Sequence, residues 1–384
     1  MSNPLSSLAE EAQGAYEAGN FDAAIKKQIQ LIDVATRRGR LRAQNHLALA
    51  MFLFESGAFQ ESLDWLQKAV AIWPTNPQLW ENIGVLLLRL ERWDEARIEL
   101  ERSVALGSKS LNVFDSLCHC YGRLKDSVAT QRYGRRVLEA KNKAALAKGT
   151  IYPLPSQLPP GFDPKRKQSN IISYSLWGNN PRYIAPLLEN LKILPHLFPA
   201  WTIRVYIDKS VPNDVMSQLK RNGADLVAKA SQRDASFYSR LLWRFEVAND
   251  SAVQRFLVRD ADSLLTVKER IAVDAWLKSN AYFHMMRDFY THTDLMLAGM
   301  WGGVGNILPD LQKVWRDYRS EFVQGRTADQ RLLSDMVWPT VSQSCLIHDS
   351  IFTGCLGSVP FPPYGDLYPG HHIGQNSFIH FSRK

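Results

Sequence analysis

A period of 34 residues, which runs from residue 46 to residue 107, constrains the fold of this 384-residue chain more than any other feature. The segment Phe-Gln-Glu-Ser at 59–62 recurs as Trp-Asp-Glu-Ala at 93–96, and Leu66 recurs as Leu100. Periods of this length arise from supersecondary units that bury their apolar faces only by stacking on their neighbours. The sequence therefore predicts an N-terminal array of stacked helix pairs.

The repeated unit carries the pattern Trp-x-x-Ile-Gly-x-x-Leu at residues 80–87, followed by Ala96. This pattern resembles the tetratricopeptide repeat. We expect about four units over residues 5–143, of which the first and last are degenerate, as capping units are. The resemblance implies a helical-repeat solenoid, placed at residues 1–148, that binds a protein partner in its groove. A plain helical bundle is the alternative.

The composition narrows the functional classes without identifying one. The formal charge of +8 includes basic clusters that fit solvated helix faces, or peripheral contact with an acidic partner or an anionic membrane surface. No nucleic-acid-binding signature accompanies them, so we expect no nucleic-acid partner. No apolar run approaches the roughly 20 residues that span a bilayer, and the first residues lack the pattern of a signal peptide. We therefore expect a cytoplasmic protein.

A change in composition separates the repeats from the rest of the chain. Residues 149–169 are rich in proline, which favours extended, semi-rigid linkers. We place a linker there and a second domain at residues 170–384. In this domain strands alternate with helices, which predicts a mainly parallel sheet covered by helices. The expected strands include residues 171–176, 201–207, 224–228 and 256–258.

Two carboxylates follow the last of these strands. Asp260 and Asp262 stand one residue apart, directly after the apolar residues Phe256 to Val258. Ligands bind outside the carboxyl ends of the strands in open α/β sheets, and hard divalent cations prefer oxygen ligands. The pair therefore suggests a site for a metal ion and a diphosphate, although the same tripeptide is also typical of a polar exit from a strand.

Several further segments of the second domain resemble one family. They include Ser-Tyr-Ser-Leu-Trp-Gly-Asn-Asn-Pro-Arg-Tyr at 173–183, Val-Arg-Asp-Ala-Asp-Ser at 258–263, Leu-Ala-Gly-Met-Trp-Gly-Gly at 297–303 and Thr-Ala-Asp-Gln at 327–330. In this order they resemble GT-A-type nucleotide-sugar glycosyltransferases, and more narrowly a bacterial and algal group associated with polysaccharides. The resemblance implies a GT-A fold with a mixed, mainly parallel sheet. It also implies transfer of a sugar from a UDP- or GDP-linked donor to a glycan or protein acceptor.

The resemblance also implies a metal site for Mn2+ or Mg2+. In the family, the second Asp of Asp-x-Asp usually binds the metal directly, which corresponds to Asp262. The first contacts the ribose or a metal-bound water, which corresponds to Asp260. Many members add a histidine from a C-terminal His-x-x-Gly motif, which corresponds to His371 or its neighbour His372. A pair of surface histidines is the alternative for this motif.

The other expected site residues rest on the same resemblance. Catalytic roles are expected of Asp329, Asp288 and His284. Asp329 also fits a helix N-cap. Arg259 also fits a structural ion pair, and one of Arg240 and Arg244 is expected to be structural. Nucleotide-sugar binding is expected of Ser175, Trp177, Asn180, Tyr183, Arg240, Arg244, Arg259, Asp260 and Gly302, among which the arginines match phosphate geometry.

Two other functions stay open on the sequence. One is a helical-repeat scaffold whose transferase domain is catalytically silent. The other is a haloacid-dehalogenase-like phosphatase, because residues 260–265 resemble its Asp-x-Asp-Gly-Thr-Leu motif. That family places its nucleophile on the first strand of the core, whereas several expected strands precede Asp260. Binding of a metal–nucleotide complex would separate the transferase from the phosphatase, and turnover would separate it from the scaffold.

Overall fold

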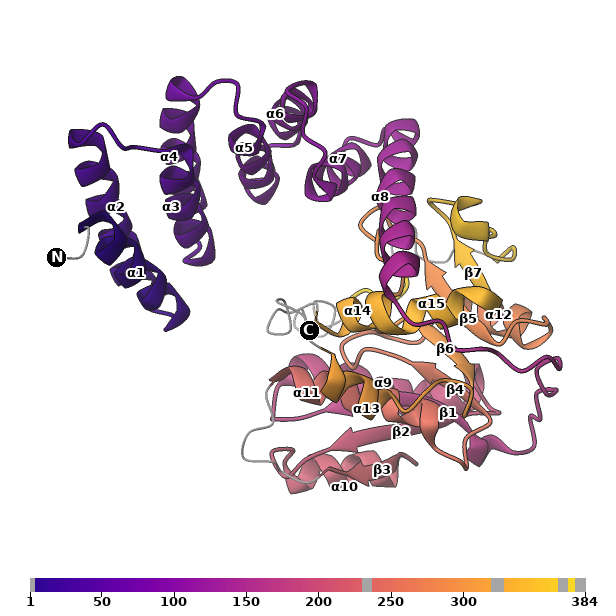
Figure 1. Cartoon of the computed structure of the whole chain (residues 1–384). Coiled ribbons are helices and arrows are strands. Elements are labelled where there is room, and N and C mark those ends of the chain that lie inside the picture. The colour runs from indigo at the N-terminus through magenta and orange to yellow at the C-terminus, as the bar shows by residue number, and fades with distance from the viewer. Residues whose placement is uncertain (1–3, 230–236, 319–327, 365–371, 377–384) are drawn as a thin grey trace. The chain divides into compact units, whose positions relative to one another are not determined.

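The computed structural model describes residues 4–229, 237–318, 328–364 and 372–376. The chain divides into two compact units, Met1–Val137 and Leu138–Lys384 (Figure 1), and each has its own hydrophobic core. Within the described ranges, no helix combines the length and the apolarity needed to cross a bilayer.

The first unit is a solenoid of helices joined by short turns. Gly57 and Gly107 lie in two of these turns with φ of 86° and 93°, a backbone conformation that glycine adopts without steric cost. The expected helical-repeat solenoid is therefore confirmed. Its helices are α1 (Pro4–Glu17), α2 (Phe21–Arg37), α3 (Ala43–Glu55), α4 (Phe59–Ile72), α5 (Pro77–Arg89), α6 (Trp93–Ala105), α7 (Leu111–Arg123) and the beginning of α8 (Ser127–Lys148).

The repeated positions are those at which the helices meet. Gly84 of α5 lies so close to α6 that a Cβ at this position would collide with the side chain of Leu100. Leu100 itself is fully buried. Ser103, which takes the place of Ala69 in the preceding repeat, is buried and donates a hydrogen bond to the carbonyl of Pro77 at 2.7 Å. Small residues at these positions thus permit close approach of neighbouring helices.

The second unit contains a seven-stranded mixed sheet in the order β3-β2-β1-β4-β6-β5-β7. Strand β6 is antiparallel to its neighbours β4 and β5, and the other pairs are parallel. A mixed sheet with helices is therefore confirmed. The strands are β1 (Asn170–Leu176), β2 (Thr202–Ile207), β3 (Asp225–Ala228), β4 (Arg255–Val258), β5 (Phe283–Arg287), β6 (Trp301–Val304) and β7 (Cys345–Asp349).

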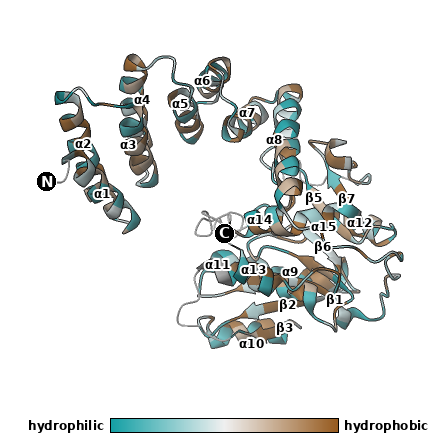
Figure 2. Ribbon diagram, viewed as in Figure 1, coloured by the Kyte–Doolittle hydropathy of each residue, from teal (hydrophilic) through white to brown (hydrophobic). Residues whose placement is uncertain are grey.

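The core of this unit lies between the central strands and their helices. All residues of β1 and β4 are buried, and apolar residues gather in the strands of the sheet (Figure 2). Leu187 and Leu191 of α9 pack in one cluster with Ile172 and Val205 of the sheet. The helices are α9 (Pro181–Leu197), α10 (Asn213–Arg221), α11 (Phe237–Leu242), α12 (Val267–Leu277), α13 (Leu311–Asp317), α14 (Ala328–Leu332) and α15 (Trp338–Val341).

The proline-rich segment at residues 149–169 belongs to the second unit. Most of it forms neither helix nor strand, but it is fastened to the domain that follows. The backbone N–H of Tyr152 donates to the hydroxyl of Thr340 at 3.1 Å, and Phe162 stacks on Trp201 with 5.7 Å between ring centroids. The division between the units falls before this segment, within α8.

Candidate functional site

Asp260 and Asp262 lie where the strand order reverses. Strand β1 has β2 on one side and β4 on the other, so the chain builds one side of the sheet first and then crosses β1 to form β4. In open α/β sheets such a reversal creates a crevice at the carboxyl ends of the two strands, and ligands bind there. The two carboxylates follow β4, while Trp177 and Asn180 follow β1, so both groups lie at this position.

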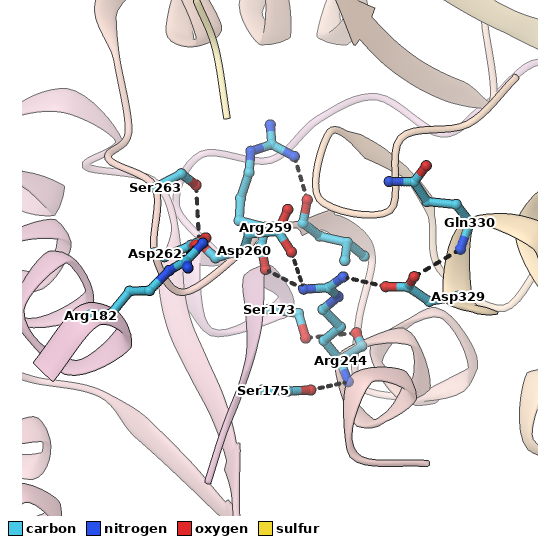
Figure 3. A network of polar contacts seen from close by, with 11 residues as sticks. Ser173, Ser175, Arg182, Arg244, Arg259, Asp260, Asp262, Ser263, Asp329 and Gln330 are labelled. Carbon is cyan, nitrogen blue, oxygen red and sulfur yellow. Dashed lines mark hydrogen bonds and ion pairs between the residues drawn. The ribbon is translucent and has the colours of Figure 1, made fainter. Parts of the chain in front are cut away.

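Arg244 joins two of the acidic residues (Figure 3). Its guanidinium donates to Asp260 through Nη1 and to Asp329 Oδ2 through Nη2, the latter at 2.9 Å. Two serines of β1 fix its backbone: its N–H donates to Ser175 Oγ at 3.0 Å, and Ser173 Oγ donates to its carbonyl at 2.8 Å. Alternate residues of a strand point to the same side. Strand β1 therefore positions Arg244, which binds both carboxylates. Ser175 contributes by accepting the hydrogen bond from the Arg244 backbone.

Burial makes two acidic residues of the site, Asp329 and Asp262, harder to ionise. It raises the pKa of Asp329, a rise that Arg244 opposes and Asp260 increases. Burial also raises the pKa of Asp262, again with a contribution from Asp260. Asp329 lies in the first turn of α14 and is not its N-cap. The raised pKa values of Asp329 and Asp262 mean that an added cation would favour the ionised form of both carboxylates.

Arg182 pairs with Asp262 from the surface, and sequence analysis missed it. Its Nη2 lies 2.8 Å from Asp262 Oδ2, and its side chain is 45% exposed, against 15% for the aspartate. It lies in the first turn of α9, which Asn180 caps by accepting a hydrogen bond from the Arg182 N–H at 3.0 Å. A basic residue there opposes the helix dipole. That mismatch was the available signal that Arg182 has a partner outside its helix.

Packing requires glycine at two positions of the motif at residues 297–303. A Cβ at Gly299 would collide with Oδ2 of Asp260, so this glycine makes room for the carboxylate. A Cβ at Gly302 would collide with the carbonyl of Phe256, because Gly302 lies in β6 and pairs with β4. Packing in the sheet therefore explains the glycine at this position, and contact of Gly302 with a nucleotide sugar stays a prediction. Strand β6 itself was missed, since glycine is depleted in strands.

Two further predicted site residues belong to the core. Arg259 is 1% exposed, and its Nε lies 2.7 Å from Oε1 of the equally buried Glu269. Arg259 therefore forms a buried ion pair, and its contact with the donor stays a prediction. His284 is also 1% exposed. Its Nε2 lies 2.8 Å from Nδ1 of His348 on β7, and its ring stacks on Trp276. His284 is thus enclosed within the sheet, and its catalytic role stays a prediction.

The remaining predicted donor-binding residues lie around the ends of β1 and β2. Trp177 packs edge-on against Trp243, with 6.5 Å between ring centroids, and Tyr183 lies in the first turn of α9. Arg240 of α11 pairs with Asp208, the residue after β2, with 3.3 Å between Nε and Oδ2. These side chains stay candidates for contact with a nucleotide.

A second polar cluster lies after β5. Asp288 is 7% exposed, and its Oδ2 lies 2.8 Å from Lys268 Nζ, a partner that sequence analysis missed. The backbone N–H of Ile373 also donates to this oxygen at 3.0 Å. Potential ligand atoms of Asp288, His292 and His372 all lie within 4.8 Å of one another. The structure thus brings Asp288, predicted as catalytic, into a cluster with two histidines.

The C-terminal histidines were expected to share a metal ion with Asp260 and Asp262. Where the structure describes the chain, His372 groups with Asp288 and not with that pair of carboxylates. His371 lies outside the described residues. The described part of the Asp-x-Asp site therefore consists of carboxylates and arginines.

Comparison with known proteins identifies the repeats. A tetratricopeptide repeat family model matches residues 10–77, and no match was found among curated proteins. A mutant of the Thermobaculum terrenum O-GlcNAc transferase is similar at 16% identity and a TM-score of 0.37; the match covers 60% of this chain and 42% of that one. MamA from Desulfovibrio magneticus RS-1 is 13% identical, with a TM-score of 0.33 and coverage of 37% and 77%. The Sgt2 TPR domain from Aspergillus fumigatus is 14% identical, with a TM-score of 0.30 and coverage of 33% and 82%. The match to the family model shows that the first unit contains tetratricopeptide repeats.

Proposed function

We propose that the second unit is a GT-A-type glycosyltransferase domain that moves a sugar from a UDP- or GDP-linked donor to a glycan or protein acceptor. One observation carries the proposal: Asp260 and Asp262 follow β4 at the reversal of strand order, beside the residues that follow β1. Open α/β sheets bind nucleotides at this position. The GT-A-like motifs that contain both carboxylates support the same function.

The two carboxylates fit a divalent cation. Mn2+ and Mg2+ prefer oxygen ligands, and a bound ion would neutralise charge on the departing diphosphate. Asp262 is the better ligand, because its partner Arg182 is 45% exposed and free to turn into solvent. Asp260 is held by the buried Arg244. The raised pKa of Asp262 means that this carboxylate gains from added positive charge.

Arg182 and Arg244 have different proposed roles: Arg182 binds a phosphate, and Arg244 positions carboxylates. Once Asp262 takes another partner, Arg182 is free to pair with a phosphate oxygen, for which guanidinium has the right geometry. Arg244 is buried between Asp260 and Asp329, so its role is to hold these carboxylates in place. Asp329 would then orient the acceptor hydroxyl, the role that its Asp-Gln motif implies.

The repeats would recruit a protein partner or the acceptor. Tetratricopeptide arrays generally present an extended concave surface to protein segments, and the first unit has a core of its own. The chemistry is assigned to the second unit, which contains all the residues named above. A role in polysaccharide biosynthesis follows from the group that the motifs resemble.

A thermal-shift screen of the full chain with UDP- and GDP-linked sugars tests the proposal. A donor at many times its Kd should stabilise the second unit by a few kcal/mol, and only with Mn2+ or Mg2+ present. Asp262→Asn should abolish the shift. Asp274→Asn is the control, since Asp274 forms a surface pair with Arg270 on α12, and it should keep the shift. A wild-type shift that persists in EDTA would show that donor binding does not need a metal ion. The complete absence of a shift would favour the silent scaffold.

A further inference from the structure

We infer that Asp288, His292 and His372 bind a transition-metal ion, with Zn2+ as the preferred occupant, at a site separate from the Asp-x-Asp carboxylates. Each side chain offers one ligand atom, and these atoms lie within 4.8 Å of one another. Two imidazoles and one carboxylate suit Zn2+, whereas Mg2+ and Ca2+ take oxygen ligands. The inference goes beyond the proposed function and does not rest on it.

The contacts of His372 leave one ring nitrogen available to an ion. Its Nδ1 lies 2.8 Å from the carbonyl oxygen of Ile373. A carbonyl only accepts hydrogen bonds, so Nδ1 carries the hydrogen and Nε2 keeps its lone pair. Metal-ligating histidines commonly donate their other N–H to a carbonyl in this way, which fixes the tautomer. Phe289 stacks on the ring with 4.3 Å between centroids and so holds its orientation.

His292 holds an unprotonated nitrogen beside Asp288. The backbone N–H of Asp288 donates to Nδ1 of His292 at 3.2 Å, so the lone pair of this nitrogen is engaged in that hydrogen bond, and an ion bound at Nδ1 would take the place of the N–H. The same atom lies 3.8 Å from Oδ1 of Asp288. Because Nδ1 of His292 accepts this hydrogen bond, the imidazole is in its neutral form, which is the form that binds metal ions.

The carboxylate of Asp288 is held with one oxygen toward the histidines. Its side chain is 0% exposed, and Oδ2 lies 2.8 Å from the ammonium of Lys268. The N–H of Ile373 donates to Oδ1 and Oδ2 at 3.2 and 3.0 Å. Because Oδ2 holds the ammonium, Oδ1 is the oxygen that would bind the ion. Lys268 competes for the same negative charge and so limits the affinity of the site.

An ion at this position would fasten the C-terminal segment to the sheet domain. His372 begins a short described segment, residues 372–376, and Asn376 at its other end forms a β-bridge with Ser263. Ser263 directly follows Asp262. The ion would therefore fix one end of a segment whose other end lies against the loop after β4. This geometry points to a structural ion.

Spectroscopic titration of the full chain with Co2+, after treatment with a chelator, tests the site directly. Co2+ bound through nitrogen and oxygen in a tetrahedral site absorbs in the visible range, and Zn2+ should displace it. His292→Ala and His372→Ala should each weaken binding by at least about tenfold. His196→Ala is the control, because His196 is exposed on α9, and it should bind as wild type does. Lys268→Met should bind more tightly, since it removes the competing ammonium.

Two more variants make the result decisive. Asp288→Asn keeps the shape of the side chain and should lose the Co2+ spectrum. Circular dichroism of each variant shows whether the fold is kept. Asp262→Asn should leave the spectrum unchanged, because Asp262 lies outside the cluster. A wild-type spectrum in folded His292→Ala, His372→Ala and Asp288→Asn would overturn the inference. Loss of the spectrum in Asp262→Asn would also overturn it, since the two sites would then be one.

Discussion

The guanidinium of Arg244 lies 2.9 Å from the carboxylate of Asp329, although 85 residues separate the two in the sequence. The same guanidinium also binds Asp260. Arg244 and Asp329 are 3% and 6% exposed, so water cannot replace either partner. One buried cation thus ties α14 to the loop after β4 and shapes the acidic side of the candidate site.

Removing this cation should destabilise the second unit strongly. In Arg244→Met, the carboxylates of Asp260 and Asp329 lose their shared partner, and breaking a buried pair from one side costs about 3–5 kcal/mol. Urea denaturation measures the loss. The control is Arg182→Met, which removes an exposed arginine and should cost at most about 1 kcal/mol. Similar losses in the two variants would contradict the central position of Arg244.

The free energy of unfolding should depend on pH because the pKa of Asp262 is raised in the folded state. Burial raises this pKa, and Asp260 adds to the rise. The folded state therefore binds the proton more tightly than the unfolded state, and stability is lost as pH rises through the folded pKa. Asp262→Asn removes this loss, so the variant should be more stable than wild type at pH 7. The difference should vanish below the unfolded pKa of about 3.9.

Urea denaturation of wild type and Asp262→Asn at several pH values measures this effect in the absence of added metal. A variant less stable than wild type at pH 7 would show that the pair of Asp262 with Arg182 outweighs burial.

Gly299 should be intolerant of any side chain. In Gly299→Ala, the new methyl group would occupy the place of Asp260 Oδ2, so the carboxylate must move and donor binding should be lost. Overpacking of this kind also costs about 1–3 kcal/mol of stability. The control is Gly161→Ala, because a Cβ there meets nothing within 4 Å. Donor binding at wild-type strength in Gly299→Ala would separate Asp260 from the donor site.

A matched pair of glycines tests the repeat packing. Gly84→Ala should destabilise the first unit by about 1–3 kcal/mol, because the methyl group would collide with Leu100. Gly14→Ala on α1 meets nothing within 4 Å and should stabilise its helix by about 0.5–1 kcal/mol, since alanine favours helix over glycine. Thermal unfolding of both variants measures the difference, and equal shifts would contradict the tight contact between α5 and α6.

The second unit should bind the donor without the repeats. A fragment of residues 138–384 keeps the contacts of the proline-rich segment, including those of Tyr152 and Phe162, which a later start would remove. Calorimetry should give the fragment the same donor affinity as the full chain, while binding of a repeat partner is lost. A folded fragment that binds no donor would mean that the repeats complete the site.

The features that the sequence predicts well are periodic or lie at strand ends. The 34-residue period follows from contacts between neighbouring helices, so Gly84 and Leu100 could be recognised without a structure. The position of Asp260 and Asp262 at the end of a buried strand likewise follows from local pattern. Such features depend on residues that are close in sequence or repeat regularly.

The features that the sequence does not reveal depend on distant partners. Arg259 and His284 both lie in segments that resemble a binding site. Each is nevertheless buried against a partner, Glu269 or His348, that no local pattern indicates. The pairing of Arg182 with Asp262 joins residues 80 apart. Charge type and spacing predict which residues can bind phosphate or metal, but burial by the tertiary fold decides which of them reach a ligand.

We propose that Asp262 supports metal-dependent binding of a nucleotide diphosphate at the reversal of strand order. Calorimetric titration of the full chain with UDP and GDP, in Mn2+ and in EDTA, measures this binding, and the proposal can be judged on that one experiment. The proposal predicts binding of one nucleotide in Mn2+, loss of that binding in EDTA, and loss in Asp262→Asn with Mn2+ present. Binding of equal strength in EDTA, or in Asp262→Asn, would contradict it.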